Sequence, residues 1–259
     1  MPHTSRTRKQ QSLTQKRHQV TSDDGWTHVT TRNNARRVNL KNARLDSPNS
    51  VVQPGELMLE PAEAPARFTL GELERQYAVH RDRWLESETW KRCQETLLEI
   101  GNRGQIDGIV CIGLGSVSGF LRDGWVDRRS VSMYQLAALE GIKRKLSSIT
   151  SLSIPVYIQD PVFNKLDCAL LESMGMTIVE HPVAFGYITR NTLLFCPGAE
   201  RQHLELVLPS KPRILFGGPL EDTESDVIQS FVGSMGSRAL LPFSANEHAF
   251  WMTRIYFSS

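Results

Sequence analysis

The stretch GIVCIGLGSVSGF, residues 108–120, decides the fold that we predict for this chain. Its first half is a continuous apolar run of strand length, which is typical of a strand that is buried on both faces of a sheet. Its second half places two glycines one residue apart, followed by serines. A loop with so few side chains can offer its backbone N–H groups to a phosphate or nucleotide, or it can be a tight turn between a strand and a helix.

Strand and helix patterns alternate after this stretch. Before it, apolar residues recur every three or four positions from Phe68, which predicts a leading helical segment. After it, we predict helices over residues 132–149, 164–175, 199–208 and 221–235, strands over 154–160, 176–180, 192–198 and 212–218, and two last strands in RALLPF and FWMTRIYF. Such alternation implies parallel pairing through right-handed crossovers. The predicted fold is therefore α/β, a Rossmann-like three-layer sandwich with a mostly parallel sheet over residues 67–259.

The N-terminal quarter of the chain differs in composition from the rest. Residues 1–50 carry ten Lys and Arg against three Asp, a net charge of +7, whereas the whole chain has a net charge of +2. Their few apolar residues show no sustained period, so we predict a disordered basic tail and linker over residues 1–66. Trp26 and Val29 lie within this arm; they can stack on a nucleic-acid base or contact a partner, or be incidental to a solvated tail.

Bulk composition limits the class of protein. The chain has 40% hydrophobic and 22% charged residues, which is ordinary for a globular protein with a core of its own. Its four cysteines are widely spaced, which favours reduced, buried thiols and an intracellular protein. We find no apolar stretch of the roughly 18 residues that a membrane span requires, and no secretory signal. We therefore expect a cytosolic or nuclear location and no membrane partner.

Ligands of open parallel sheets usually bind beyond the carboxyl ends of the strands, where the strand order reverses. This rule selects five candidate ligand-binding residues at the ends of the first two predicted strands. They are Gly113, Gly115, Ser116, Ser118 and Asp160. We predict that the amides of residues 113–116 and the carboxylate of Asp160 face one crevice. A nucleotide-like ligand or S-adenosylmethionine would suit it, although the dinucleotide fingerprint requires glycine at position 118 and this chain has serine.

Catalytic candidates are few. His181 can act as a general base or be a surface histidine, and Cys196 can be a nucleophile or a core thiol. We expect no metal site, because the sequence lacks the spacing of His, Cys and carboxylates that metal ligands show. Trp84 and Trp90 can contact a partner, but aromatic residues at helical spacing more often belong to the core.

Four segments in this order, CIGLGSVSG, YQLAAL, YIQDPVFN and TLLFCP, carry a family resemblance. The chain resembles the Sensitivity to Red Light Reduced (SRR-like) family over about residues 84–257, and DDGWTHV is similar to a segment often found before that domain. There are two departures. Family members usually continue the TLF strand with Met-Pro-His-Cys, where this chain has Cys196 to Ala199, and they usually have Glu-Gly where this chain has Phe185 and Gly186.

What the resemblance implies is a regulatory role. Members are linked to light and circadian signalling in plants, and elsewhere to microtubule stability, haem synthesis and transcriptional regulation, without an agreed biochemical activity. The style of the sequence is that of a fungal member. We therefore expect a non-enzymatic regulatory protein that binds a small ligand or a protein partner, with nucleic acid as a further partner of the basic tail. The alternative is a methyltransferase-like enzyme that uses S-adenosylmethionine.

Overall fold

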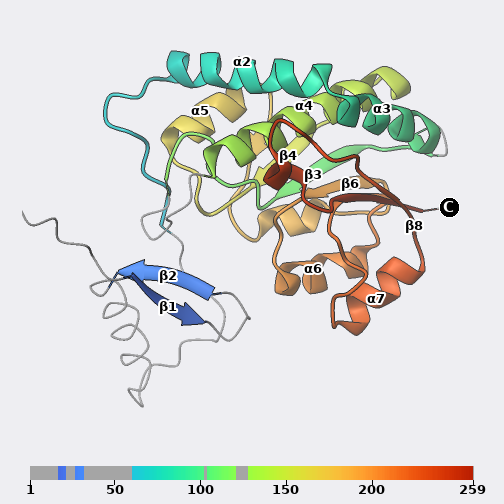
Figure 1. Ribbon diagram of the computed structural model, residues 1–259. Helices are drawn as coiled ribbons and strands as arrows, with labels where there is room; N and C mark the ends of the chain where they lie inside the picture. The colour runs from blue at the N-terminus through green and yellow to red at the C-terminus, as the bar shows by residue number, and fades with distance from the viewer. Residues whose placement is uncertain (1–16, 22–26, 32–59, 102–103, 121–127, 259) are drawn as a thin grey trace, which may run out of the picture. The chain divides into compact units, whose positions relative to one another are not determined.

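The computed structural model describes residues 17–21, 27–31, 60–101, 104–120 and 128–258 (Figure 1). The chain divides into two units, residues 1–57 and 58–259. In the first unit, strands β1 (Arg17–Thr21) and β2 (Thr27–Thr31) pair in antiparallel fashion, with Gln19 opposite Val29. These strands lie within the segment for which no regular structure was predicted. The rest of residues 1–59, Trp26 included, falls outside the described residues.

The second unit is built on a seven-stranded sheet with the order β5-β4-β3-β6-β7-β9-β8. Its strands are β3 (Gly108–Ile112), β4 (Val156–Gln159), β5 (Thr177–Ile178), β6 (Thr192–Cys196), β7 (Ile214–Gly217), β8 (Gly236–Ala239) and β9 (Arg254–Phe257). The first five pair in parallel, and β9 is antiparallel to both β7 and β8. From β3 the chain moves outward to β5 on one side, and then returns to β6 on the other. The strand order therefore reverses between β3 and β6.

Helices cover both faces of this sheet (Figure 1). The helices are α2 (Leu70–Glu86), α3 (Glu88–Gly101), α4 (Arg129–Thr150), α5 (Lys165–Ser173), α6 (Arg201–Val207) and α7 (Asp226–Gly233), with 3-10 turns η1 (Val183–Tyr187), η2 (Leu208–Ser210) and η3 (Glu247–Phe250). One face carries α2 to α5, and the other carries α6 and α7. The predicted α/β class with a mostly parallel sheet is confirmed. In the part of the chain that the structure describes, no helix is both long enough and apolar enough to span a bilayer.

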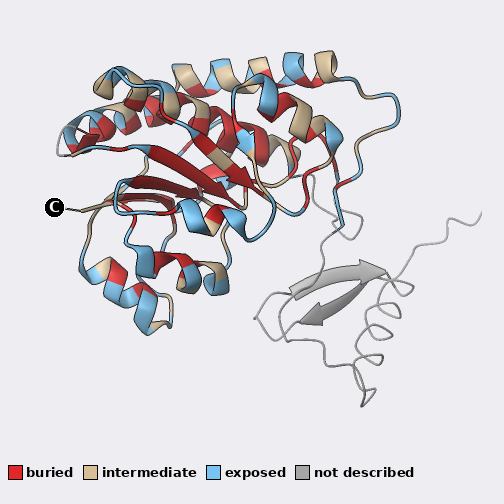
Figure 2. Ribbon diagram, turned by 180° about the vertical axis from the view of Figure 1, so that it is seen from behind, coloured by how far each residue is buried: buried red, intermediate tan, exposed pale blue. Residues whose placement is uncertain are grey.

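Alternate residues of the strands enter two separate cores. In β3, Ile109 and Cys111 pack beneath α2 to α5, whereas Val110 and Ile112 pack against α6 and α7. All five residues of β3 are buried because helices cover both faces. Figure 2 shows the same burial for the central strands, between helices whose outer faces are exposed. This two-sided cover is the physical reason why β3 reads as a continuous apolar run.

An aromatic cluster joins α2 to the C-terminal part of the domain. The Trp84 side chain is fully buried, and its ring centroid lies 4.6 Å from that of Phe250 and 5.3 Å from that of Phe243. Trp90 is also buried, 5.8 Å from Trp84 between ring centroids. Both tryptophans therefore belong to the core. Phe243 was predicted to end a strand, but β8 stops at Ala239 and the Phe243 side chain packs into this cluster.

Residues 60–66, which we predicted to be linker, are placed with the second unit. Ala62 is buried, and its N–H donates to the Val162 carbonyl at 2.8 Å. Helix α2 then begins at a capping box in which Thr69 and Glu72 bind each other's backbone N–H groups. The packed region thus starts a few residues before position 67.

We predict that Trp84→Ala lowers the free energy of unfolding by about 3–5 kcal/mol, because it leaves a cavity at the centre of the aromatic cluster. Val79→Ala on the same helix is the control, since that side chain is 50% exposed and its loss should change stability by less than about 0.5 kcal/mol. Urea unfolding followed by fluorescence and circular dichroism measures both. Equal denaturation midpoints for the two variants would show that the cluster does not stabilise the domain.

Candidate functional site

The predicted glycine loop and the predicted acid lie at the same edge of the sheet, after β3 and β4. The Gly115 N–H donates to Asp160 Oδ2 at 2.7 Å, and the Val162 N–H donates to Asp160 Oδ1 at 3.0 Å. Burial raises the pKa of the Asp160 carboxyl, and these two N–H donors oppose that change. Because the loop amide and the carboxylate are bonded directly, no ligand atom lies between them.

A second carboxylate accepts hydrogen bonds from three further donors of the loop. Asp167 is fully buried, and its Oδ1 accepts hydrogen bonds from the N–H groups of Val117 at 3.1 Å and Ser118 at 2.9 Å. Its Oδ2 accepts from Ser116 Oγ at 2.7 Å and from the Asn164 N–H at 3.0 Å. The loop therefore binds an anion, as its lack of side chains indicates, but the anion belongs to the protein itself. Ser116 and Ser118 are both buried in this arrangement.

The same carboxylate starts helix α5. Asn164 is the N-cap, and its Oδ1 accepts from the N–H groups of Leu166 at 2.8 Å and Asp167 at 3.2 Å. Asp167 completes this capping box through the Asn164 N–H. The sequence prediction missed Asp167. The signal that could have found it is the Asn-x-x-Asp spacing directly before an apolar helix.

At the reversal of strand order, the loops after β3 and β6 touch through their backbones. A Cβ atom added to Gly198 would lie 3.1 Å from the Gly113 carbonyl oxygen, and one added to Gly113 would lie 3.4 Å from the Gly198 oxygen. Gly113 and Gly115 both have positive φ, 73° and 77°, which L side chains rarely adopt. In addition, a Cβ at Gly115 would lie 2.8 Å from Ser132 Oγ. A side chain at either position would therefore be strained, which explains why both residues are glycine.

A pocket of about 180 Å³ opens at the carboxyl ends of β6 and β7. Its lining includes Cys196, Ala199, Arg201, Leu204, Gly218 and Thr223. The Arg201 guanidinium forms an ion pair with Glu205 at 2.9 Å. Burial raises the pKa of the Cys196 thiol to about 12, so this side chain is a neutral thiol in the lining. This agrees with the interpretation of Cys196 as a core thiol and not as a nucleophile.

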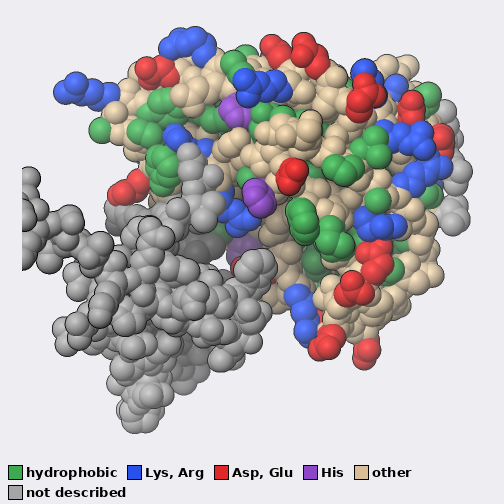
Figure 3. All heavy atoms as spheres, in the orientation of Figure 1, with side chains coloured by type: hydrophobic (Ala, Val, Ile, Leu, Met, Phe, Trp, Pro, Cys, Tyr) green, Lys and Arg blue, Asp and Glu red, His purple; other side chains and the backbone are tan. Residues whose placement is uncertain are grey.

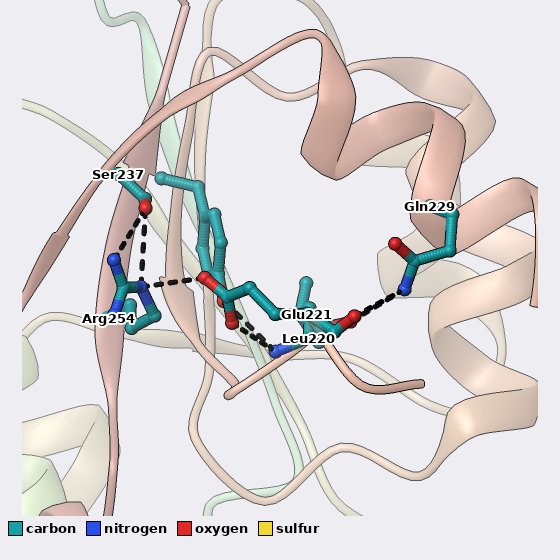
Figure 4. Close-up of polar contacts among 6 residues, drawn as sticks. Leu220, Glu221, Gln229, Ser237 and Arg254 are labelled. Atoms are coloured by element: carbon teal, nitrogen blue, oxygen red, sulfur yellow. Dashed lines mark hydrogen bonds and ion pairs between the residues drawn. The ribbon is translucent and has the colours of Figure 1, made fainter. Parts of the chain in front are cut away.

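The loop after β7 forms one side of this pocket and is held by side chains from β9 and α7 (Figure 4). Tyr256 Oη accepts from the Leu220 N–H at 3.0 Å and donates to Glu221 Oε2 at 2.9 Å. Arg254 pairs with Glu221 at 2.8 Å. Gln229 Nε2 lies within 3.1 Å of the carbonyl oxygens of three loop residues, Leu220, Glu221 and Thr223. These contacts link the pocket wall to β9 and to α7.

His181 lies in a small polar and aromatic cluster after β5. Its Nδ1 lies 2.9 Å from Gln159 Nε2, and its ring centroid lies 5.3 Å from Phe185 and 5.8 Å from His203. The partner of the His181 ring is thus a neutral amide, whereas a general base is usually oriented by a carboxylate. Among the residues that the structure describes, no three His, Cys, Asp or Glu side chains are grouped so that they could hold a metal ion.

The sequence motifs that carried the resemblance serve internal contacts. The loop of the GLGS segment binds Asp160 and Asp167, as described above. Gln135 of the QLA segment is buried, and its Nε2 donates to the Ala249 carbonyl at 2.9 Å. Phe163 of the DPVF segment packs into the core. The GLGS and DPVF segments therefore join the ends of β3 and β4, and the QLA segment joins α4 to η3.

We predict that Asp167→Asn lowers the free energy of unfolding by at least about 2 kcal/mol, because one amide oxygen cannot satisfy the donors of both carboxylate oxygens and each orphaned buried donor costs about 1–3 kcal/mol. The matched control is Glu172→Gln, which removes the same charge from an exposed position of α5. Urea titration of both variants gives the difference. A midpoint of Asp167→Asn equal to that of Glu172→Gln would contradict the anchoring role of the carboxylate.

Comparison with known proteins agrees with the resemblance seen in the sequence. The family model of the SRR1 domain matches residues 93–257. No curated protein matches the chain at a significant level. The matched range contains the whole seven-stranded sheet, from β3 to β9. Since it spans more than half of the chain, the protein belongs to the SRR1 domain family.

Proposed function

We propose that this chain is a regulatory, non-enzymatic member of its family that binds a small ligand or a protein partner at the carboxyl edge of the sheet. The observation that carries the proposal is the pocket of about 180 Å³ at the ends of β6 and β7. It lies beside the reversal of strand order, where open α/β sheets bind their ligands. Its surface is more polar than apolar and includes one guanidinium and one hydroxyl, which suits a small polar ligand with an anionic group.

The ligand-binding residues predicted from the sequence take two roles in this proposal. Gly113 is beside the pocket, since a Cβ added to it would lie 3.6 Å from the backbone nitrogen of Ala199, a lining residue. We propose that Gly113 leaves room for the ligand there. Gly115, Ser116, Ser118 and Asp160 act indirectly, because their hydrogen bonds hold the loop next to the site.

Two features favour binding over catalysis. The thiol in the pocket lining is held neutral by burial, which disfavours a nucleophilic role for Cys196. The ring of His181 is oriented by the amide of Gln159. From the family membership we further propose a role in signalling, circadian or transcriptional regulation. From the composition and style of the sequence we propose a cytosolic or nuclear protein of fungal type.

Methyl transfer from S-adenosylmethionine is the second candidate function. The sheet favours it, because β9 lies antiparallel between β7 and β8, the strand arrangement that Rossmann-like methyltransferases use. The position of Asp160 at the end of the second parallel strand also agrees. Against it, both carboxylate oxygens of Asp160 accept backbone hydrogen bonds, which leaves this acid less able to bind a ribose. A shared fold is in any case weak evidence for a shared reaction.

A thermal-shift screen tests the ligand site, with S-adenosylmethionine, NAD, nucleotides and haem precursors as probes. A ligand at 100 times its Kd stabilises a protein by about 2.7 kcal/mol, which raises Tm by roughly 5–10 °C in a domain of this size. We predict that Ala199→Trp, which fills the pocket, abolishes the shift. Ser230→Trp on the exposed side of α7 should retain it.

Two results would contradict these proposals. A shift that survives Ala199→Trp would place the ligand elsewhere. If S-adenosylmethionine gives the shift and S-adenosylhomocysteine accumulates with turnover, the methyltransferase is favoured and the non-enzymatic proposal is wrong. If no probe stabilises the protein, binding of these small ligands is contradicted, and binding of a protein partner is the part of the proposal that remains.

The basic arm is proposed as a nucleic-acid contact. On the face shown in Figure 3, acidic and basic side chains are interspersed, so the visible part of the second unit offers no large basic surface. We predict that replacing Arg36, Arg37 and Lys41 by Gln weakens binding to single-stranded DNA. The negative slope of log affinity against log salt should become shallower by about 0.7 for each phosphate that the arm no longer neutralises. Replacing the exposed basic residues Lys91, Arg92 and Lys165 is the control. Equal slopes for the two triple variants would exclude the arm.

A further inference from the structure

Residues 61–63 form a short clasp across the end of the glycine loop. The Glu63 N–H donates to the Phe120 carbonyl at 2.9 Å and the Phe120 N–H donates back to the Glu63 carbonyl at 2.9 Å, which makes an antiparallel bridge. On the other side, the Ala62 N–H donates to the Val162 carbonyl at 2.8 Å, and Asn164 Nδ2 donates to the Ala62 carbonyl at 3.0 Å. Ala62 and Glu63 are thus held by four hydrogen bonds between two segments that are distant from them in sequence.

The groove that the clasp fills selects a small side chain at its centre. Ala62 is 4% exposed, whereas Pro61 and Glu63 on either side are exposed. A Cβ added to Gly119 would lie 2.9 Å from the Ala62 Cβ and 2.8 Å from Asn164 Nδ2. The groove therefore accommodates Ala62 because Gly119 has no side chain, and a large residue at position 62 would not fit.

Two prolines limit how strongly this segment can bind. Pro61 begins the clasp and Pro65 lies two residues after it, and neither has a backbone N–H to donate. The pairing therefore cannot extend in either direction through those positions. An extended peptide without proline at these places could make the same bonds and add more. Recognition of an extended peptide through main-chain hydrogen bonds, with one small pocket for specificity, is a common mode of binding between proteins.

We propose that the groove between Phe120 and Val162 is a peptide-binding site, which residues 61–63 occupy in cis and which a partner protein occupies by displacing them. The partner presents an extended, acidic segment with Ala, Gly or Ser at the central position. Acidic character follows from the cis segment, which carries Glu60 and Glu63, and from Arg129, whose guanidinium lies 4.1 Å from the centre of the Phe120 ring.

This proposal is independent of the pocket at β6 and β7. It assigns a role to the N-terminal side of the domain, since residues 60–66 precede the family match. Asn164 contacts both the clasp and Ser118 of the glycine loop, so displacement changes the surroundings of that loop.

The first experiment opens the clasp in the full-length chain by Ala62→Trp. The probe is a fluorescent synthetic peptide with the sequence of residues 60–66 and threonine in place of both prolines. A segment tethered by a short linker competes at millimolar effective concentration, so we expect the peptide to bind Ala62→Trp more tightly than the wild type by about tenfold or more in fluorescence anisotropy. Ala66→Trp, at an exposed position of the same segment, should behave as the wild type. If Ala62→Trp binds the peptide no better than Ala66→Trp, the proposal is overturned.

The second experiment uses the wild-type chain and decides the matter even if Ala62→Trp fails to fold. Hydrogen exchange is followed at the amides of Ala62, Glu63 and Phe120, with and without a large excess of the unlabelled peptide. Displacement should remove protection from Ala62 and Glu63 while Phe120 stays protected, because the peptide replaces its partner. Unchanged protection of all three amides in the presence of the peptide contradicts the proposal, as does loss of protection at Phe120.

Discussion

The structure depends on one buried carboxylate. Asp167 has no exposed surface, and a carboxylate in that position is tolerated only if hydrogen-bond donors surround it. The donors come from the loop after β3 and from the N-cap of α5, so a single side chain joins the ends of two successive strand-helix units. The loop has the conformation that fits around this carboxylate, and the neighbouring Asp160 bonds to the same loop through Gly115.

This anchor changes where a ligand can bind. A glycine loop at the end of the first parallel strand is the usual place for a phosphate or a nucleotide, because its amides are free to bind an anion. Here the amides of Gly115, Val117 and Ser118 already bind the side chains of Asp160 and Asp167. A pocket lies along the same edge of the sheet, beyond the contact between Gly113 and Gly198. For this reason the proposed ligand site lies at the ends of β6 and β7.

The N-terminal side of the domain extends beyond the residues that define the family. Helix α2 lies outside the matched range, yet Trp84 fills the centre of an aromatic cluster with Phe243 and Phe250. Residues 61–63 bond to the glycine loop and to the turn after β4 in the same way that a partner's strand would. A segment with the composition of a proline-rich linker thus takes part in the fold. The hydrogen bonds of the clasp are also the ones that we propose a partner replaces.

Much of this protein followed from sequence alone. The two-sided apolar run of β3, the helical periods and the glycine breaks were sufficient for the α/β class, because hydrophobic period reflects burial directly. The family resemblance came from the four quoted sequence segments, and the family match supports it. The placement of Gly115 near Asp160 also followed, since parallel strands end at the same edge. Only the tertiary structure decided what fills the loop, because backbone amides bind a ligand anion and an internal carboxylate with the same chemistry, and Asp167 lies about fifty residues away in sequence.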